Sequence, residues 1–254
     1  MLLAIDVGNT NTVLGAFEGK ELKRTWRVST HPLVTPDELR MKIHSLFELD
    51  GIHAPAIRAV IMSSVVPPMT AVLRQAFPNV DVRIIDHTWP FSFSIAAQPA
   101  SGVGADRLVN AETVIREYGG PAIIIDSGTA TTLCALSRDQ RYLGGAIMAG
   151  IELSIEALAR NTAKLFSVEL VAPARAIGSN TAEALQSGLL FGYAAMLDGM
   201  VARFKAELGE PNARVVATGG VSAMLKGIAQ SFTDVDPDLT LKGIAYLYEA
   251  IQKQ

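Results

Sequence analysis

Two carboxylates stand where apolar strands run into glycine turns, an arrangement suited to binding phosphate. Asp6 precedes the polar segment Gly8–Thr12. Asp126 precedes a second such segment, Gly128–Thr132. The apolar runs before both carboxylates are typical of strands buried on both faces, and glycine and asparagine favour tight turns because they tolerate positive φ. Each segment therefore predicts a hairpin with a carboxylate and several hydroxyl groups gathered at its turn.

The first hairpin has the groups that a nucleotide phosphate site needs. Its backbone N–H groups and its polar side chains, from Asn9 to Thr12, could surround phosphate oxygens. Asp6 could hold a Mg²⁺ ion that arrives with the nucleotide, because Mg²⁺ prefers one or two carboxylates together with phosphate oxygens and water. The alternative for either hairpin alone is a turn needed only for folding.

A third segment, Val215–Val221, predicts a strand that runs into the double glycine Gly219-Gly220 ahead of a helix. Glycine lets a backbone approach a flat ligand closely. The order of the two hairpins and this segment resembles the superfamily of actin, the sugar kinases and the heat-shock ATPases. The resemblance implies an α/β fold of two duplicated ribonuclease H-like (actin-like ATPase) domains with an interdomain cleft. We expect the two halves to span residues 1–118 and 119–254.

A kinase also needs a group that accepts the proton of the substrate hydroxyl, and Asp106 is the candidate. It lies in the segment Gly102–Arg107, where glycines precede a predicted helix. Such glycines expose N–H groups at the positive end of the helix dipole, and Arg107 could bind a carboxylate through two hydrogen bonds. The alternative is that Asp106 is an ordinary residue at a helix N-terminus and Arg107 its solvated neighbour.

The composition excludes several classes of protein. The chain has 254 residues, of which 49% are hydrophobic and 19% charged, and its net charge is −3. It has no basic run of the kind that binds nucleic acid, and no apolar stretch of the roughly 18 residues that cross a bilayer. Cys134 is the only cysteine and the four histidines lack metal-ligand spacing, so neither a disulfide nor a structural metal is expected. We therefore expect a cytoplasmic protein.

Local patterns predict alternating strands and helices. Thr35, Pro36 and Glu38 have the spacing of a helix start with a capping box, and Asp50-Gly51 ends that helix. The tract 87–103 has no helical period and is predicted as an irregular loop. The other predicted elements are strands at 57–66, 82–86, 142–147 and 214–217, and helices at 71–76, 107–118, 152–161, 180–208, 222–229 and 239–251.

The predicted helix 180–208 carries small residues at helical spacing. This stripe comprises Ala184, Gly188, Gly192, Ala195 and Gly199. Small residues permit close helix packing, either inside a domain or between subunits. Together with the apolar composition, the stripe favours an oligomer in which this helix contributes to the interface.

Six motifs together resemble those of one family in this superfamily, the type III pantothenate kinases. They occur in the family's order, and the resemblance covers essentially the whole chain. The motifs are Asp6–Thr12, Ser63–Pro67, Gly104–Arg107, Asp126–Thr132, Asn180-Thr181 and Asp236–Thr240.

The resemblance implies an enzyme that transfers the γ-phosphoryl group of ATP to the primary hydroxyl of pantothenate. The product would be 4'-phosphopantothenate, and the reaction the first step of coenzyme A biosynthesis. The resemblance also implies a cytoplasmic homodimer that uses ATP-Mg and a monovalent cation, K⁺ or NH₄⁺. The expected partners are pantothenate, ATP and a second copy of the chain, with no nucleic acid and no membrane.

Carried over residue by residue, the resemblance assigns roles to the matching positions. The catalytic proton acceptor would be Asp106, the monovalent-cation ligand Asp126, and the Mg²⁺ carboxylate Asp6, acting through phosphate or water. For Asp126, a second Mg²⁺ carboxylate or a turn former at a strand end are alternatives. The ATP site would comprise Asp6, Val7, Gly8, Asn9, Thr10, Asn11, Thr12, Val13 and Thr129. The pantothenate site would comprise Gly104, Ala105, Asp106, Arg107 and Thr181.

The chain departs from the family pattern at several positions. Ser127 stands where the family often has phenylalanine, and Ala149 and Phe166 each replace an expected proline. The region 95–99 lacks an aromatic substrate contact that the family often has there, and Phe93 could substitute for it. These changes leave the polar roles intact but could reshape the substrate site.

Two other functions stay open at the level of sequence. One is a kinase or phosphohydrolase that acts on another small hydroxylated substrate. The other is a non-catalytic nucleotide-binding regulator, because a fold alone does not determine function. The presence of Asp6, Asp106, Arg107 and Asp126 favours an enzyme over a regulator.

Overall fold

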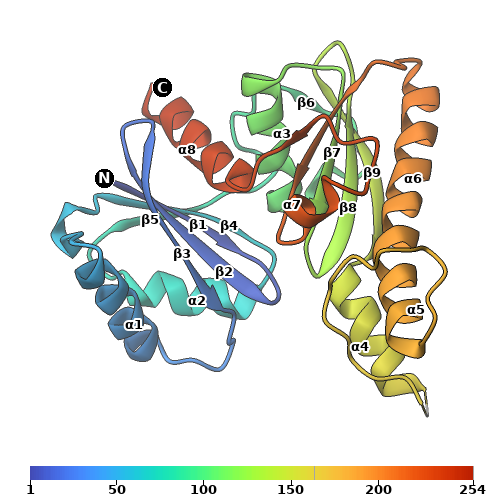
Figure 1. The fold of residues 1–254 in the computed structure, drawn as a ribbon. Coiled ribbons are helices and arrows are strands. Elements are labelled where there is room, and N and C mark those ends of the chain that lie inside the picture. The colour runs from blue at the N-terminus through green and yellow to red at the C-terminus, as the bar shows by residue number, and fades with distance from the viewer. Residues whose placement is uncertain (163, 254) are drawn as a thin grey trace. The chain divides into compact units, whose positions relative to one another are not determined.

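The computed structural model describes residues 1–162 and 164–253, and its contacts divide the chain into two compact units. Unit 1 comprises Met1–Glu117 together with residues 238–253, and unit 2 comprises Tyr118–Pro237. Each unit is built around a mixed β-sheet with helices packed on it (Figure 1). The predicted α/β class and the predicted duplication are thereby confirmed.

The sheet of unit 1 has the strand order β3-β2-β1-β4-β5. Strand β2 runs antiparallel to β1 and β3, whereas β4 runs parallel to β1 and β5 runs parallel to β4. The strands are β1 (Leu2–Val7), β2 (Asn11–Glu18), β3 (Glu21–Ser29), β4 (Ala59–Ser64) and β5 (Asp81–Ile84).

Strands of unit 2 repeat this order as β9-β8-β7-β10-β11, with the same parallel and antiparallel pairings. In both units the pairing of the second strand with the third contains a register shift. It lies at Ala16/Phe17 in β2, which pairs with β3, and at Ala135/Leu136 in β8, which pairs with β9. The strands are β7 (Ala122–Ser127), β8 (Ala130–Leu136), β9 (Arg141–Ala149), β10 (Arg214–Thr218) and β11 (Asp234–Val235).

The two sheets also agree in register at their carboxylates. Asp6 of β1 pairs with Ser63 of the parallel strand β4. Asp126 of β7 pairs with Thr218 of the parallel strand β10. Paired residues on neighbouring strands project to the same face of a sheet, so each carboxylate has a hydroxyl residue beside it.

Helices cover both faces of the unit 1 sheet (Figure 1). Helices α1 (Pro36–Leu49) and α2 (Pro67–Ala76) pack on one face, and α3 (Ala105–Glu117) and α8 (Leu239–Gln252) on the other. The predicted capping box at the start of α1 is present, because the Glu38 N–H donates to Thr35 Oγ1 and the Thr35 N–H donates to Glu38 Oε2.

Alternation along β1 and β4 shows which side chains face which helices. Leu3 and Ile5 belong to the core beneath α1 and α2. Ala4 of β1 and Ile61 of β4 belong to the core beneath α3 and α8. Asp6, two residues beyond Ala4, therefore lies on the α3 and α8 face at the carboxyl end of β1.

Helix α8 follows unit 2 in the sequence but packs in unit 1, whereas we expected it in the second half, within residues 119–254. Thr240 Oγ1 donates a hydrogen bond to Asn110 Oδ1 of α3 at 2.8 Å. Gly243 lies so close to the Val109 carbonyl that a Cβ at this position would clash with it. The apolar face of α8 is thus buried against α3 and the sheet of unit 1, which decides its place in the fold.

The loop predicted at 87–103 contains only the short strand β6 (Ser94–Ile95) and a 3₁₀ turn at Ala100–Gly102. A buried carboxylate of α3 fixes this loop. Glu112 accepts hydrogen bonds from the Ser92 N–H at 2.8 Å and from Ser92 Oγ at 2.9 Å, and it pairs with Arg116 Nε at 2.5 Å. Another 3₁₀ turn, Ala54–Ala56, precedes β4.

Unit 2 has four helices among its described residues, and all of them follow its first three strands. The helices are α4 (Ile151–Asn161), α5 (Thr181–Ser187), α6 (Tyr193–Leu208) and α7 (Ser222–Leu225). A π-helical turn, Gly188–Gly192, joins α5 to α6, so the predicted helix over 180–208 is confirmed with one irregular turn. Helix α7 is shorter than the predicted 222–229.

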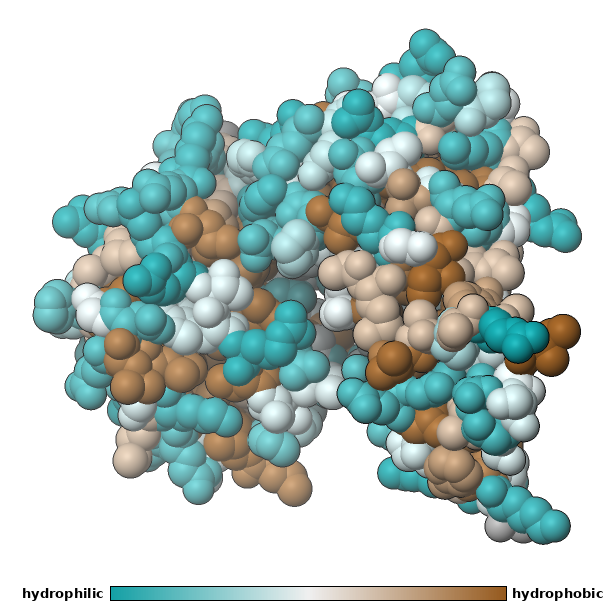
Figure 2. Space-filling model, viewed as in Figure 1, coloured by the Kyte–Doolittle hydropathy of each residue, from teal (hydrophilic) through white to brown (hydrophobic). Residues whose placement is uncertain are grey.

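No helix in the described part of the chain combines the length and the apolar character needed to cross a membrane. The face drawn in Figure 2 carries many hydrophilic residues, with apolar residues interspersed among them.

Candidate active site

The turn between β1 and β2 exposes polar groups at the carboxyl end of β1. The Gly8 N–H donates to the Asn11 carbonyl at 3.0 Å, and the side chains of Asn9 and Thr10 are exposed. We predicted glycine and asparagine here because they tolerate positive φ, but neither Gly8 nor Asn9 has a positive φ. The structure gives a different reason for the glycine: a Cβ at position 8 would lie 3.1 Å from the Asn11 carbonyl oxygen.

The underside of this turn is held by two threonines. Thr12, one of the predicted ATP contacts, is buried, and its hydroxyl lies 2.9 Å from Thr30 Oγ1. Thr30 Oγ1 donates to the Gly8 carbonyl at 2.8 Å, so its single proton is used and Thr12 must donate to Thr30. The Thr30 N–H also donates to the Thr10 carbonyl at 2.9 Å.

Sequence reasoning missed Thr30 as a residue of the site. It lies directly beyond β3, and only the pairing of Asn11 with Ser29 brings it beneath the turn. Thr12 and Thr30 therefore fix the shape of the turn from below, while Asn9 and Thr10 are exposed on its outer side.

The segment Gly104–Arg107 lies in the same unit as this turn, at the start of α3. The Val65 N–H donates to the Val7 carbonyl at 3.1 Å, which ties the end of β4 to the end of β1. Val65 Cγ1 in turn lies 3.7 Å from the position that a Cβ of Gly104 would take. The phosphate-type turn and the proposed proton acceptor Asp106 thus share one edge of the unit 1 sheet.

The observed position of the Asp106 side chain leaves no room for a Cβ at Gly104. A Cβ at position 104 would overlap Asp106 Oδ1, and the same oxygen accepts a hydrogen bond from the Arg107 N–H at 2.8 Å. Desolvation raises the pKa of the Asp106 carboxyl above its ordinary value, although the Arg107 N–H and the Arg107 charge act in the opposite direction. A carboxylate with a raised pKa is a better proton acceptor near neutral pH than an exposed one.

The second carboxylate site lies in unit 2 at the turn between β7 and β8. The Gly128 N–H donates to the Ala130 carbonyl at 3.2 Å, so this turn is one residue shorter than the one that Gly8 closes. The half-buried Thr129 accepts a hydrogen bond at its carbonyl from the Gly150 N–H, at 3.0 Å. A Cβ at Gly150 would clash with the Gly128 and Thr129 carbonyls. The start of α4 therefore lies against the backbone of this turn. Asp126 and Thr129 are thereby brought together.

The double glycine after β10 also lies beside β7. Gly219 has φ of +94°, and a Cβ there would lie 2.5 Å from the Ser127 carbonyl oxygen. Gly220 has no such neighbour within 4 Å. The first glycine is therefore required by the fold itself, whereas the second leaves open space, as expected for a backbone that a flat ligand could approach.

Thr181 is the first residue of α5 and its side chain is exposed. Asn180 Oδ1 accepts from the Glu183 N–H at 3.0 Å, and Glu183 Oε2 accepts from the Ser179 N–H at 2.8 Å. The hydrogen bonds that this carboxylate accepts from the Ser179 N–H and from Ser179 Oγ lower the pKa of Glu183. The motif Asn180-Thr181 thus begins a helix, on an element separate from the Asp126 turn.

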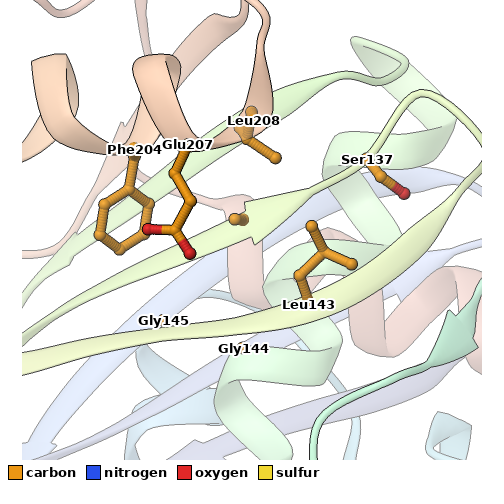
Figure 3. Close-up of a pocket in the computed structure, with 8 residues that line it drawn as sticks. Ser137, Leu143, Gly144, Gly145, Phe204, Glu207 and Leu208 are labelled. Carbon is orange, nitrogen blue, oxygen red and sulfur yellow. The ribbon is translucent and has the colours of Figure 1, made fainter.

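A pocket of about 510 Å³ lies elsewhere in unit 2, between the end of α6 and the strands β8 and β9. Figure 3 shows Phe204 and Glu207 on α6 facing Leu143 and the glycines of β9. Its residue Ser137 follows the end of β8 opposite to the Thr129 turn. No predicted site residue is among the residues that line this pocket, which offers one carboxylate and few hydrogen-bond donors.

Among the described residues, no group of three or more histidine, cysteine, aspartate or glutamate side chains is arranged to hold a metal ion. Asp6 and Asp126 lie at separate turns, one in each unit. Single carboxylates suit a Mg²⁺ ion whose remaining ligands are phosphate oxygens and water. The residues therefore fit a cation that arrives with a nucleotide, and they do not form a closed metal cage.

The family described as Type III pantothenate kinase matches residues 2–203 of the chain. The chain belongs to this family. Type III pantothenate kinases from Rubrobacter xylanophilus and from Exiguobacterium sp. are similar to it along its length. The first is 45% identical, covering 98% of this chain and 97% of the relative, and the second is 44% identical, covering 100% of both.

The chain is therefore an enzyme with pantothenate kinase activity, a reaction of coenzyme A biosynthesis. A solved structure, the (R)-2-hydroxyglutaryl-CoA dehydratase component A from Acidaminococcus fermentans, has a similar fold. Its TM-score is 0.56 at 15% identity, and the match covers 97% of this chain and 96% of that one. Such neighbours are actin-like ATPase fold proteins, which confirms the predicted fold class of this pantothenate kinase.

Proposed function

We propose that the chain transfers the γ-phosphoryl group of ATP to the primary hydroxyl of pantothenate, in the first step of coenzyme A biosynthesis, with the residues at the edge of the unit 1 sheet. The observation that carries the proposal is the position of Asp106. Its carboxyl group lies at the start of α3, joined through Gly104 and Val65 to the turn that follows Asp6.

In this reaction the β1–β2 turn binds the phosphates of ATP. The N–H groups and side chains between Gly8 and Asn11 supply donors, with Thr12 and Val13 supporting them from β2. Asp6 would hold Mg²⁺ through phosphate or water, and the ion when bound would supply positive charge to the transferred group. Thr129 of unit 2 makes a second contact with ATP.

Asp106 accepts the proton of the pantothenate hydroxyl as that oxygen attacks the γ-phosphorus. The bond from the γ-phosphorus to the oxygen that bridges it to the β-phosphate breaks, and ADP leaves. The raised pKa of Asp106 supports this role, because the carboxylate holds a proton more readily than an exposed aspartate. Arg107 binds the carboxylate of pantothenate, and the small residues Gly104 and Ala105 leave room for the substrate. Thr181 contributes a further hydrogen bond to it.

Phosphoryl transfer passes through a loose transition state, so positioning and charge neutralisation contribute more than the base does. We assign Asp126, at the equivalent turn in unit 2, to a monovalent cation, K⁺ or NH₄⁺, as the motifs shared with the family imply. An enzyme that lacks this cation would keep its fold and lose part of its neutralising charge.

The active form is proposed to be a cytoplasmic homodimer that uses the stripe of small residues on the helix over 181–208. The Cβ positions of Gly188, Gly192 and Gly199 have no neighbour within 4 Å, and Met196 on the same helix is 36% exposed. Such a helix face can approach a second copy of the chain closely. Sedimentation or light scattering of the purified protein tests this, and a monomer would contradict it.

The experiment that tests the reaction is phosphorylation of pantothenate by the purified protein with ATP and Mg²⁺, in K⁺ and again in Na⁺. Product that depends on K⁺ and is lost in Asp106→Asn supports the base and the cation together. Nucleotide binding without product, from folded protein in either salt, would favour a regulator of the same fold. Product with another hydroxylated substrate would favour a different kinase.

A further inference from the structure

Ser63 is a buried residue of β4 whose hydroxyl has no hydrogen-bond partner among the described residues. It pairs in register with Asp6 on the neighbouring parallel strand. Parallel strands lie about 4.8 Å apart, and paired side chains project to the same face. A buried hydroxyl normally forms a hydrogen bond with protein or with water. We therefore expect a hydrogen-bond partner for Ser63 Oγ on the face of the sheet that carries Asp6.

The sheet register places Ser63 beside one of the two proposed functional carboxylates. Asp6 lies beside it across the sheet. Val65 follows the end of β4, and its Cγ1 lies 3.7 Å from the Cβ position of Gly104, itself against Asp106 Oδ1. Ile61, two residues before Ser63 on β4, belongs to the core beneath α3 and α8, so Ser63 projects to that face of the sheet.

We infer that Ser63 is a positioning residue for Asp6: its hydroxyl donates to a water molecule that the Asp6 carboxylate also binds, and it so orients Asp6 toward the Mg²⁺ of the bound nucleotide. The inference rests on the proposed function, which assigns Mg²⁺ to Asp6. A water molecule suits the position because Ser63 Oγ makes no direct hydrogen bond to Asp6, and a hydroxyl donor and a carboxylate acceptor on adjacent strands can share one bridging water.

Unit 2 provides a matched control in Ser127. It is buried and its hydroxyl also has no partner among the described residues. It follows Asp126 directly along β7, so its side chain projects to the opposite face of the sheet from that carboxylate. Ser127 therefore shares the burial of Ser63 but not its position beside a carboxylate.

The test measures binding of a non-hydrolysable ATP analogue by calorimetry, with and without Mg²⁺, for the wild type, Ser63→Ala, Ser127→Ala, Asp6→Asn and the double variant of Ser63 and Asp6. We expect Ser63→Ala to weaken binding about tenfold in Mg²⁺ and little without it, in line with loss of a hydrogen bond near a charged group. Ser127→Ala should bind as the wild type does. Adding Ser63→Ala to Asp6→Asn should not weaken binding further, because Ser63 acts only through the Asp6 carboxylate.

Unchanged binding by Ser63→Ala would overturn the inference while leaving the proposed function intact. An equal loss without Mg²⁺, or an additive loss in the Asp6→Asn background, would show that Ser63 acts through packing and would also overturn it. If Asp6→Asn itself binds the Mg²⁺ complex like the wild type, the proposed role of Asp6 fails and the inference fails with it. Thermal unfolding of each variant shows whether it is folded, so that binding is compared between folded proteins.

Discussion

Gly104 and Asp106 fit together so closely that the Asp106 carboxyl occupies space which any side chain at position 104 would need. The aspartate is the proposed proton acceptor, and the glycine sets its position. This relationship connects a backbone position to the proposed chemistry, because a Cβ at position 104 would displace the Asp106 carboxyl from the place that it has here.

The variant Gly104→Ala should therefore lose activity while it keeps its nucleotide site. We expect turnover to fall about a hundredfold, since displacing a reacting group by about 1 Å can cost that much. Steady-state kinetics with saturating ATP measures it. Gly102→Ala is the matched control, because a Cβ there would lie 3.4 Å from Pro99 Cγ and 3.7 Å from Pro99 Cδ. Equal effects of the two substitutions would contradict the close fit at position 104.

Asp106→Asn should lower the activity and raise the stability of the protein at neutral pH. The raised pKa of Asp106 means that the folded chain binds this proton more tightly than the unfolded chain, so wild-type stability declines as the pH rises from the unfolded pKa to the folded pKa. Asparagine removes that decline. The variant should melt at a higher temperature than the wild type at pH 8, and the gap should shrink as the pH falls toward about 4.

Thermal unfolding between pH 4 and pH 8 measures this gap. Asp139→Asn provides a control of the opposite sign, because a hydrogen bond from Ser137 Oγ lowers the pKa of Asp139. That variant should lose stability relative to the wild type as the pH rises. A gap for Asp106→Asn that is independent of pH would refute the raised pKa.

Thr30→Val should weaken both the fold and the nucleotide site. The substitution removes the donor to the Gly8 carbonyl and leaves the buried Thr12 hydroxyl without its acceptor. A buried polar group without a partner costs about 1–3 kcal/mol, and urea unfolding should show a loss of that size together with a higher KM for ATP. Adding Thr12→Val should restore much of the stability, since replacing both partners by apolar groups is nearly neutral. Failure of the double variant to recover would show that another contact of Thr30 matters more.

The two glycines after β10 should differ in their tolerance of a side chain. Gly219→Ala places a Cβ at φ of +94° and against the Ser127 backbone, so we expect it to destabilise unit 2 by about 1–3 kcal/mol and to lower ATP affinity. Gly220→Ala meets open space and should keep its stability. Denaturant unfolding and nucleotide titration of both variants check the difference. Equal stability of the two would show that the strand end adjusts to the added carbon.

The sequence by itself determined the features that depend on neighbours along the chain. The buried strands before Asp6 and Asp126, the glycine turns after them and the capping box at Thr35 all arise from local patterns, and each has the predicted element. The duplication was visible because both halves repeat the same order of apolar and polar residues. The family followed from motifs spread over the whole chain, and the comparisons confirm it.

The tertiary structure decided which residues meet. Only the sheet register places Ser63 beside Asp6 and Thr30 beneath Gly8, because these partners are far apart in sequence and carry no shared pattern. Thr12 has a hydroxyl group of the kind that can bind a ligand, yet its side chain is buried. Strand alternation and packing, rather than residue type, fix the direction of a side chain. Helix α8 joins unit 1 because its apolar face is complementary to α3 there, a property that chain order does not encode.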